Sequence, residues 1–205
     1  MCCDTVGHAT PDGAREVVRF VRGIIDEQGE KVRLDWHGHQ DRGLGVINSL
    51  AAIEGGADQV HGSALGMGER VGNTPMDQLL VNLKLLGWIK NDLSRLREYC
   101  DKAADACHWS IPLNYPVFGR DAFRTATGVH AAAVIKSYRK GDTELADLIY
   151  SGVPAGQFGL KQVIEVGPMS GKSNVIFWLE SRGFKPSEEL ASIEYTSGPS
   201  RQRLY

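Results

Sequence analysis

Apolar positions along the first 90 residues follow two alternating spacings. Short strand-like runs occupy residues 1–5, 31–36 and 57–60, and each is followed by an amphipathic segment, at residues 14–27, 43–55 and 74–86. Strands that alternate with helices of this length are typical of parallel βαβ units. The first 90 residues therefore predict three successive βα units.

The first of these helices carries clear start and stop signals. Thr10 is a favourable N-cap, and Pro11 suits the first helical position. Gly29 follows the last periodic position. One face of the helix is apolar, with Val17, Val18, Val21, Ile24 and Ile25.

The pattern changes after about residue 91 to shorter helices with Gly- and Pro-rich connections. Helices are expected over residues 92–106, 128–140 and 143–150, a Pro-bounded loop over 112–118, a strand over 162–166, and a last helix ending at Arg182. We expect a small mixed helical subdomain over residues 91–183. The polar tail, residues 184–205, is expected to be loosely ordered from residue 188 onward.

Three βα units are too few to close a (β/α)8 barrel, which needs eight units and about 250 residues. The units therefore form either a small open sheet or the last portion of a TIM barrel. In both arrangements, ligands bind where the loops gather at the carboxyl ends of the strands.

Composition excludes several classes of protein. The 205 residues contain 23 Lys and Arg against 25 Asp and Glu, and this balance argues against a nucleic-acid partner. No apolar run approaches the roughly 20 residues that span a bilayer, and no secretory signal is recognisable at the start. The four cysteines lack a paired CxxC spacing, so we expect reduced thiols and a cytoplasmic protein.

The strongest chemical signal is the His-x-His pair after the second predicted strand. Side chains alternate across a strand, so His37 and His39 are expected to face the same way and could ligate one divalent metal. A pair of surface histidines without a ligand is the alternative for an isolated HxH. Asp4 and Asp41 are the local carboxylates that could add a ligand.

Two weaker signals lie further along the chain. The loop at residues 66–73 (GMGERVGN) combines glycines, which permit close backbone approach, with the polar side chains of Glu69, Arg70 and Asn73. His130 lies near the start of the helix at residues 128–140 and is either structural or a general base. The segment at residues 167–174 lacks the spacing of a phosphate-binding loop.

Four segments together resemble the 2-isopropylmalate synthase family, metal-dependent acyltransferases of the DRE-TIM group that include homocitrate and citramalate synthases. They are DTVGHATP (residues 4–11), HGHQDRGLGVINSLAAIEGGADQVHG (37–62), GMGERVGN (66–73) and TGVHAAAVIK (127–136). The resemblance covers residues 1–183, and it implies an α/β fold that is the carboxyl-terminal part of a TIM barrel plus a subdomain reaching over a neighbouring active site in a homodimer.

The resemblance also implies roles for particular residues. His37 and His39 match the metal ligands, and Thr5 matches the threonine that contacts the 2-oxoacid carboxylate. Asn73 closes the GERxGN motif near the metal, with Glu69 in the same loop. His130 matches the histidine assigned to acetyl-CoA activation.

The implied reaction condenses acetyl-CoA with a 2-oxoacid, on a divalent metal that could be zinc, manganese or magnesium. The implied 2-oxoacid is 2-oxoisovalerate, which places the reaction in leucine biosynthesis. Homocitrate and citramalate synthases are the alternatives, and hydroxymethylglutaryl-CoA lyase is a further one. A non-catalytic half-barrel subunit is the alternative outside enzymes.

The sequence departs from the family pattern at three places. Gln40 replaces the usual Asn after HxH, and residues 167–172 (GPMSGK) replace a GKHSGR-like motif. The family's first strand supplies an Arg and the Asp that is the third metal ligand, and no such segment occurs here. We expect the chain to be inactive alone and to need a segment or a partner chain that supplies five further strands.

Overall fold

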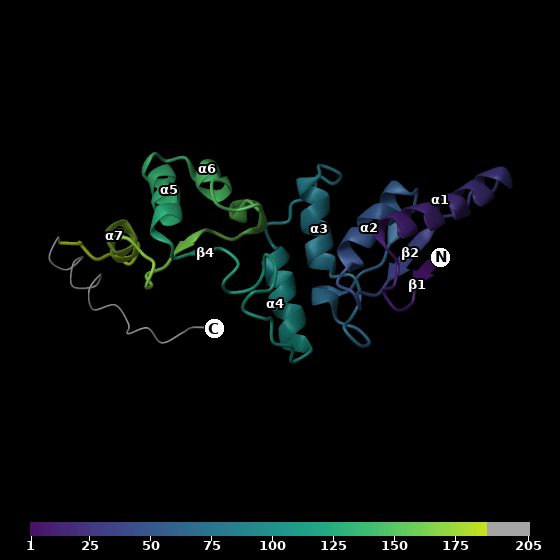
Figure 1. Ribbon diagram of the computed structural model, residues 1–205, viewed down its shortest axis with the longest axis horizontal. Coiled ribbons are helices and arrows are strands. Elements are labelled where there is room, and N and C mark those ends of the chain that lie inside the picture. Colours follow the sequence, from purple (N-terminus) through teal and green to yellow (C-terminus); the bar gives the residue numbers. More distant parts are fainter. Residues whose placement is uncertain (188–205) are drawn as a thin grey trace. The chain divides into compact units, whose positions relative to one another are not determined.

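The computed structural model describes residues 1–187, and residues 188–205, which include most of the predicted tail, lie outside the described part. The chain forms two compact units, Met1–Ile111 and Pro112–Tyr205. Figure 1 shows the helices and strands of each unit.

The first unit contains the three βα units that the sequence predicts. In chain order its elements are β1 (Cys2–Asp4), α1 (Pro11–Glu27), β2 (Asp35–Gly38), α2 (Gly45–Glu54), β3 (Gln59–Val60), the 3-10 turn η1 (Ala64–Gly66), α3 (Met76–Leu85) and α4 (Leu96–Ala106). The strands pair in parallel in the order β1-β2-β3. The register aligns Cys3 with His37 and Trp36 with Val60.

One face of this sheet packs against α1 and α2. Trp36 of β2 is buried against Val18 of α1 and Ala52 of α2, in a core that also includes Leu34. Side chains alternate along a strand, so neighbouring positions point to the opposite face. That face carries Cys3, which is exposed, and His37, which is half-buried.

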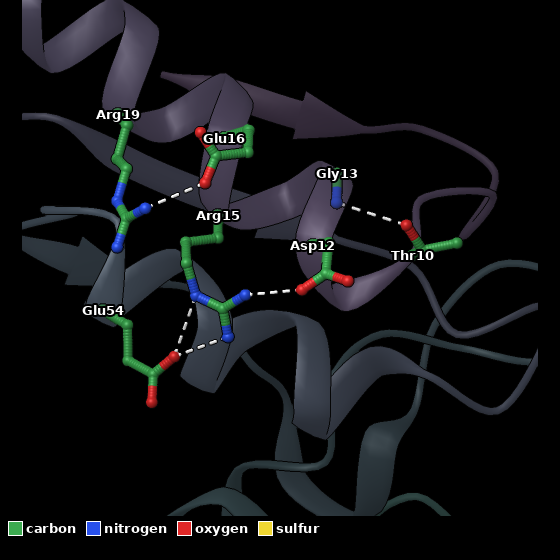
Figure 2. A network of polar contacts seen from close by, with 7 residues as sticks. All are labelled: Thr10, Asp12, Gly13, Arg15, Glu16, Arg19 and Glu54. Atoms are coloured by element: carbon green, nitrogen blue, oxygen red, sulfur yellow. Dashed lines mark hydrogen bonds and ion pairs between the residues drawn. The ribbon is translucent and has the colours of Figure 1, made fainter.

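Polar contacts tie α1 to α2 on the outer side of the unit (Figure 2). The Thr10 hydroxyl accepts the Gly13 N–H at 3.2 Å, which caps α1 as predicted. Arg15 of α1 donates to Glu54 of α2 at 2.7 Å and to Asp12 at 2.7 Å. The two helices are thus fixed side by side over the buried face.

β2 and α4 each begin four residues later than the sequence pattern predicts, and in both a carboxylate accepts a backbone N–H just before the element. β2 begins at Asp35 rather than Lys31, since the Asp58 carboxylate accepts the Leu34 N–H at 2.7 Å and no strand pairs with residues 31–34. α4 begins at Leu96, because Asp92 accepts the Ser94 N–H at 2.9 Å in an Asx turn.

The second unit is a mixed helical fold around a two-stranded sheet. Its elements are β4 (Arg124–Thr125), α5 (Gly128–Arg139), α6 (Thr143–Leu148), the 3-10 turn η2 (Ala155–Phe158), β5 (Val163–Ile164) and α7 (Lys172–Glu180). β4, which the sequence pattern does not predict, pairs in parallel with β5. The core gathers residues from α5, α6 and β5: Ala131, Val134, Ile135, Ala146 and Ile164.

Within residues 1–187, no helix combines the length and apolar character needed to cross a bilayer.

Candidate metal and substrate site

The two histidines of the HxH motif lie together at the carboxyl end of β2. His37 is in the strand and His39 follows it, so strand alternation places both on the face opposite the core that packs against α1 and α2. Their ring centroids are 5.3 Å apart in an edge-to-face arrangement. The predicted common orientation of the two side chains is present in the structure.

A third imidazole lies beside this pair, from His61 at the end of β3. Its ring centroid is 5.6 Å from that of His37, and its Nε2 is 3.5 Å from Asp35 Oδ2. The sequence pattern did not single out His61, although it follows a predicted strand just as His37 does. Only the register, which aligns Trp36 with Val60, shows that the two histidines are neighbours.

The surroundings of His37 favour its neutral form. Partial burial is the main cause that lowers the pKa of His37, and the nearby His39 and His61 lower it further. A neutral imidazole is the form that ligates a metal.

Two buried polar atoms at this end of the sheet are left without a partner in the described residues. They are His39 Nδ1 and Asn73 Oδ1. A β-bridge joins His39 to Asn73, so the two residues are adjacent, and the Asn73 amide nitrogen donates to Met67 O at 3.2 Å. Buried polar atoms without partners are rare in proteins. An imidazole nitrogen and an amide oxygen are both metal donors, so the residues fit a bound cation.

The local carboxylates are engaged elsewhere. Asp4 is buried, and its two oxygens accept the N–H groups of His8 at 2.8 Å and Ala9 at 3.1 Å. Asp41 pairs with Arg70, at 2.8 Å from Oδ1 to Nε. Across the described residues, no three His, Cys, Asp or Glu side chains are grouped so that they could hold a metal.

The glycine-rich loop packs tightly against the segment that follows β2. Gly72 has a φ of 101°, and a Cβ there would overlap the carbonyl oxygen of Gly66. Gln40, the departure from the family pattern, donates its side-chain amide to Val71 O at 3.1 Å and its backbone N–H to Gly72 O at 3.2 Å. Gln40 therefore binds the loop backbone.

The remaining predicted residues of this unit face solvent. Thr5 is exposed and follows β1, and its carbonyl accepts Arg70 Nη2 at 2.8 Å. The Glu69 side chain is 85% exposed, with its carboxylate 3.8 Å from Arg70 Nη1. The structure thus places Thr5, His37, His39, Glu69 and Asn73 in the loops and strand ends of one unit.

His130 belongs to the second unit, in the first turn of α5. Its ring stacks on that of Tyr150, with centroids 3.9 Å apart and an interplanar angle of 17°. His130 Nδ1 is buried and has no partner in the part of the chain that the structure describes. Tyr150 was not predicted, because nothing in a helical pattern indicates a stack across 20 residues.

The segment at residues 167–174 is closed by its own side chains. The Ser170 hydroxyl donates to Ala126 O at 2.6 Å, and the Asn174 amide donates to Ala126 O and Glu165 O, each at 3.1 Å. Ser170 and Asn174 are both buried. These residues hold α7 against β4 and β5, which gives Ser170 and Asn174 a structural role.

Comparison with known proteins gives the family. Residues 1–102 match the family model described as HMGL-like, and the chain belongs to that family. A homocitrate synthase of Methanopyrus kandleri is 32% identical over 189 residues, which cover 91% of this chain and 44% of that protein. An (R)-citramalate synthase of Aquifex aeolicus is 32% identical over 187 residues, covering 89% and 33%. A 2-isopropylmalate synthase of Nitrobacter hamburgensis is 30% identical over 191 residues, covering 90% and 35%.

The chain is therefore homologous to 2-isopropylmalate, homocitrate and citramalate synthases, and the predicted family is confirmed. It spans between a third and less than half of the length of these relatives. A solved HMG-CoA lyase from Acenitobacter baumannii is 26% identical with a TM-score of 0.45, covering 54% of this chain and 37% of that one. Similarity at that TM-score supports no conclusion about the fold.

Proposed function

We propose that this chain carries part of the active site of a Claisen-condensing acyltransferase that joins acetyl-CoA to a 2-oxoacid. The observation that carries the proposal is the pair His37 and His39 on the sheet face opposite the α1 and α2 core, next to Asn73, whose Oδ1 has no partner among the described residues. Homology to three synthases of this chemistry supports it. 2-Oxoisovalerate, and with it leucine biosynthesis, is the proposed substrate assignment, with the homocitrate and citramalate reactions as alternatives.

His37 and His39 would hold a divalent zinc, manganese or magnesium ion, with Asn73 beside them. When bound, the metal acts as a Lewis acid that polarises the ketone of the 2-oxoacid. The exposed hydroxyl of Thr5, on the neighbouring strand end, would bind the carboxylate of that substrate. Glu69, which lies in the glycine-rich loop, would be a catalytic residue.

His130 would take part in activating acetyl-CoA. A base must remove a proton from the acetyl methyl group, and imidazole is the side chain best suited to that near neutral pH. The stack on Tyr150 fixes the plane of the His130 ring, and Nδ1 is buried without a partner among the described residues. We propose that the second unit, which begins at Pro112, belongs to the post-barrel subdomain that the sequence predicts over residues 91–183.

We further propose that βα units outside these 205 residues complete a TIM barrel with this chain. The sheet has three strands in the described residues, and parallel sheets are normally covered on both faces. An apolar stripe on α1 is also exposed, with Val17 at 44%, Phe20 at 68% and Ile24 at 44%. The added units would bring the third metal ligand and the catalytic arginine, from a longer polypeptide, a homodimer partner or a separate chain.

The competing proposal is a non-catalytic subunit that contributes only its fold to an assembly. The same open sheet and apolar stripe would serve it equally well. The unpartnered buried atoms of His39 and Asn73 favour the catalytic function, because a purely structural loop has no use for them.

A thiol-release assay tests the proposed reaction. Acetyl-CoA would be supplied with 2-oxoisovalerate, 2-oxoglutarate or pyruvate, first to the 205-residue chain and then to an assembly that includes the complementary βα units. We expect release only from the complete assembly, with abolition by EDTA and by His130→Ala. A complete assembly that releases no thiol with any of the three acids would contradict the proposed function.

A further inference from the structure

Arg70 connects all three loops that follow the strands of the first unit. Its Nε and Nη2 donate to the two oxygens of Asp41, at 2.8 and 3.2 Å, in the loop after β2. The same Nη2 donates at 2.8 Å to the carbonyl of Thr5, after β1. Arg70 itself lies in the loop after β3. One guanidinium thus joins segments that are 65 and 29 residues away in the chain.

The backbone of Arg70 is held in an unfavourable conformation. Its φ is 56°, in the left-handed region that residues other than Gly, Asn and Asp rarely adopt. Such strain persists only where surrounding contacts determine it, and it gathers at functional sites. Glycine would fit this φ without strain but has no guanidinium. The strained backbone therefore aims the side chain at Asp41 and Thr5.

The charges of the pair are matched as well. The positively charged guanidinium of Arg70 donates to both oxygens of the negatively charged Asp41 carboxylate. A bidentate arginine–carboxylate pair fixes the relative orientation of the two side chains as well as the distance between them. That geometry suits a pair that orients a loop.

The backbone contacts beside this pair set the relative placement of His39 and Asn73. The Gln40 N–H donates to Gly72 O at 3.2 Å, and the Asn73 N–H donates to Gly66 O at 2.9 Å. Each contact includes a residue within three positions of Arg70 or Asp41. If the pair opens, the bridge between His39 and Asn73 loses its flanking support.

We propose that Arg70 and Asp41 are a positioning pair, which holds His39 and Asn73 in the geometry that binds the metal ion. Neither residue ligates the metal itself. Because it assigns a purpose to that geometry, the inference rests on the proposed function. The arrangement of the loops, however, can be measured without any metal.

Co²⁺ binding by the purified 205-residue chain, followed by its visible absorption, provides the functional test. We expect Arg70→Gln and Asp41→Asn each to weaken Co²⁺ binding about tenfold or more, the range in which residues that orient metal ligands act. Arg70→Gly should lose as much, since it relieves the backbone but removes the guanidinium. Arg70→Lys should retain part of the affinity.

Arg15→Gln is the matched control, because Arg15 also pairs with a carboxylate in this unit but joins α1 to α2. It should lower the melting temperature and leave the Co²⁺ affinity unchanged. An Arg70→Gln variant that binds Co²⁺ within twofold of the natural chain, or an equal loss in Arg15→Gln, would overturn the inference.

Amide hydrogen exchange separates this inference from the proposed function. In Arg70→Gln, and not in Arg15→Gln, the amide hydrogens of Gln40 and Asn73 should exchange faster. If the natural chain binds no Co²⁺ while this acceleration occurs, the metal site fails and the positioning of the loops stands. Unchanged exchange at both amides would overturn the inference, whatever the metal result.

Discussion

His37 and His39 lie edge-to-face, with ring centroids 5.3 Å apart, on the face of the sheet opposite the core formed with α1 and α2. The alternation of a strand produces this relationship, since residues two apart share a face. His61 extends the row from the next strand, 5.6 Å from His37. These imidazoles lie at the carboxyl ends of parallel strands, which is where a βα fold places its chemistry.

Two glycines with positive φ should respond differently to alanine. Gly29 has a φ of 70°, and a Cβ added there would meet no other atom within 4 Å, so Gly29→Ala should cost only the left-handed strain, about 1–2 kcal/mol. Gly72→Ala adds a clash with Gly66 O, so the loss in the free energy of unfolding should be clearly larger. Urea denaturation of both variants measures this difference. Equal losses would show that the loop relaxes freely.

The Asp58 carboxylate should make the first unit sensitive to acid. The Leu34 N–H, and then Arg22, lower the pKa of Asp58 below its ordinary value of 3.8. Its contribution is therefore present above pH 3.8 and lost as the pH falls through the lowered pKa of the folded state. Melting temperatures recorded from pH 6 to 2.5 should fall less steeply for Asp58→Asn.

Asp26→Asn is the control for this pH dependence, because that carboxylate lies 4.0 Å from the same Arg22 and accepts no backbone N–H from Leu34. Its acid profile should follow that of the natural chain. An Asp58→Asn profile parallel to the natural one would contradict the assigned role of Asp58.

The thiol of Cys100 should resist modification in the folded chain. Burial raises the pKa of Cys100 to about 12, so almost no thiolate exists at pH 8, and the thiolate is the reactive form. Cys3 and Cys107 are exposed and should react with Ellman's reagent within the mixing phase. Cys100→Ser should leave the number of fast-reacting thiols unchanged. It should remove one thiol from the total that reacts in denaturant. A smaller fast count in this variant would contradict the burial.

The sequence predicted those parts of the fold that local signals determine. Thr10 and Pro11 set the start of α1, and the three βα units follow from the spacing of apolar residues. The start of β2 was misplaced because alternation carries no information about pairing. At that position the Asp58 side chain, 24 residues away, accepts a hydrogen bond from the Leu34 N–H.

The site was predicted where its residues are adjacent in the chain and missed where they are not. HxH is visible in three consecutive residues, but the approach of His61 depends on the register between β2 and β3. The pairing of Arg70 with Asp41 spans 29 residues and relies on a left-handed backbone that no propensity favours for arginine. The stack of Tyr150 on His130 likewise needs the packing of α5 against α6.

Metal titration of the EDTA-treated chain tests the central claim most directly. We predict that the chain binds divalent zinc or manganese, and that His37→Ala and His39→Ala each weaken binding at least about tenfold, because removing a ligand should cost no less than removing a residue that orients one. His108→Asn is the control, since His108 is exposed and has a φ of 51° that asparagine tolerates. It should bind as the natural chain does. A natural chain that binds neither ion, or histidine variants that bind as tightly as the control, would contradict the assignment of His37 and His39 as metal ligands.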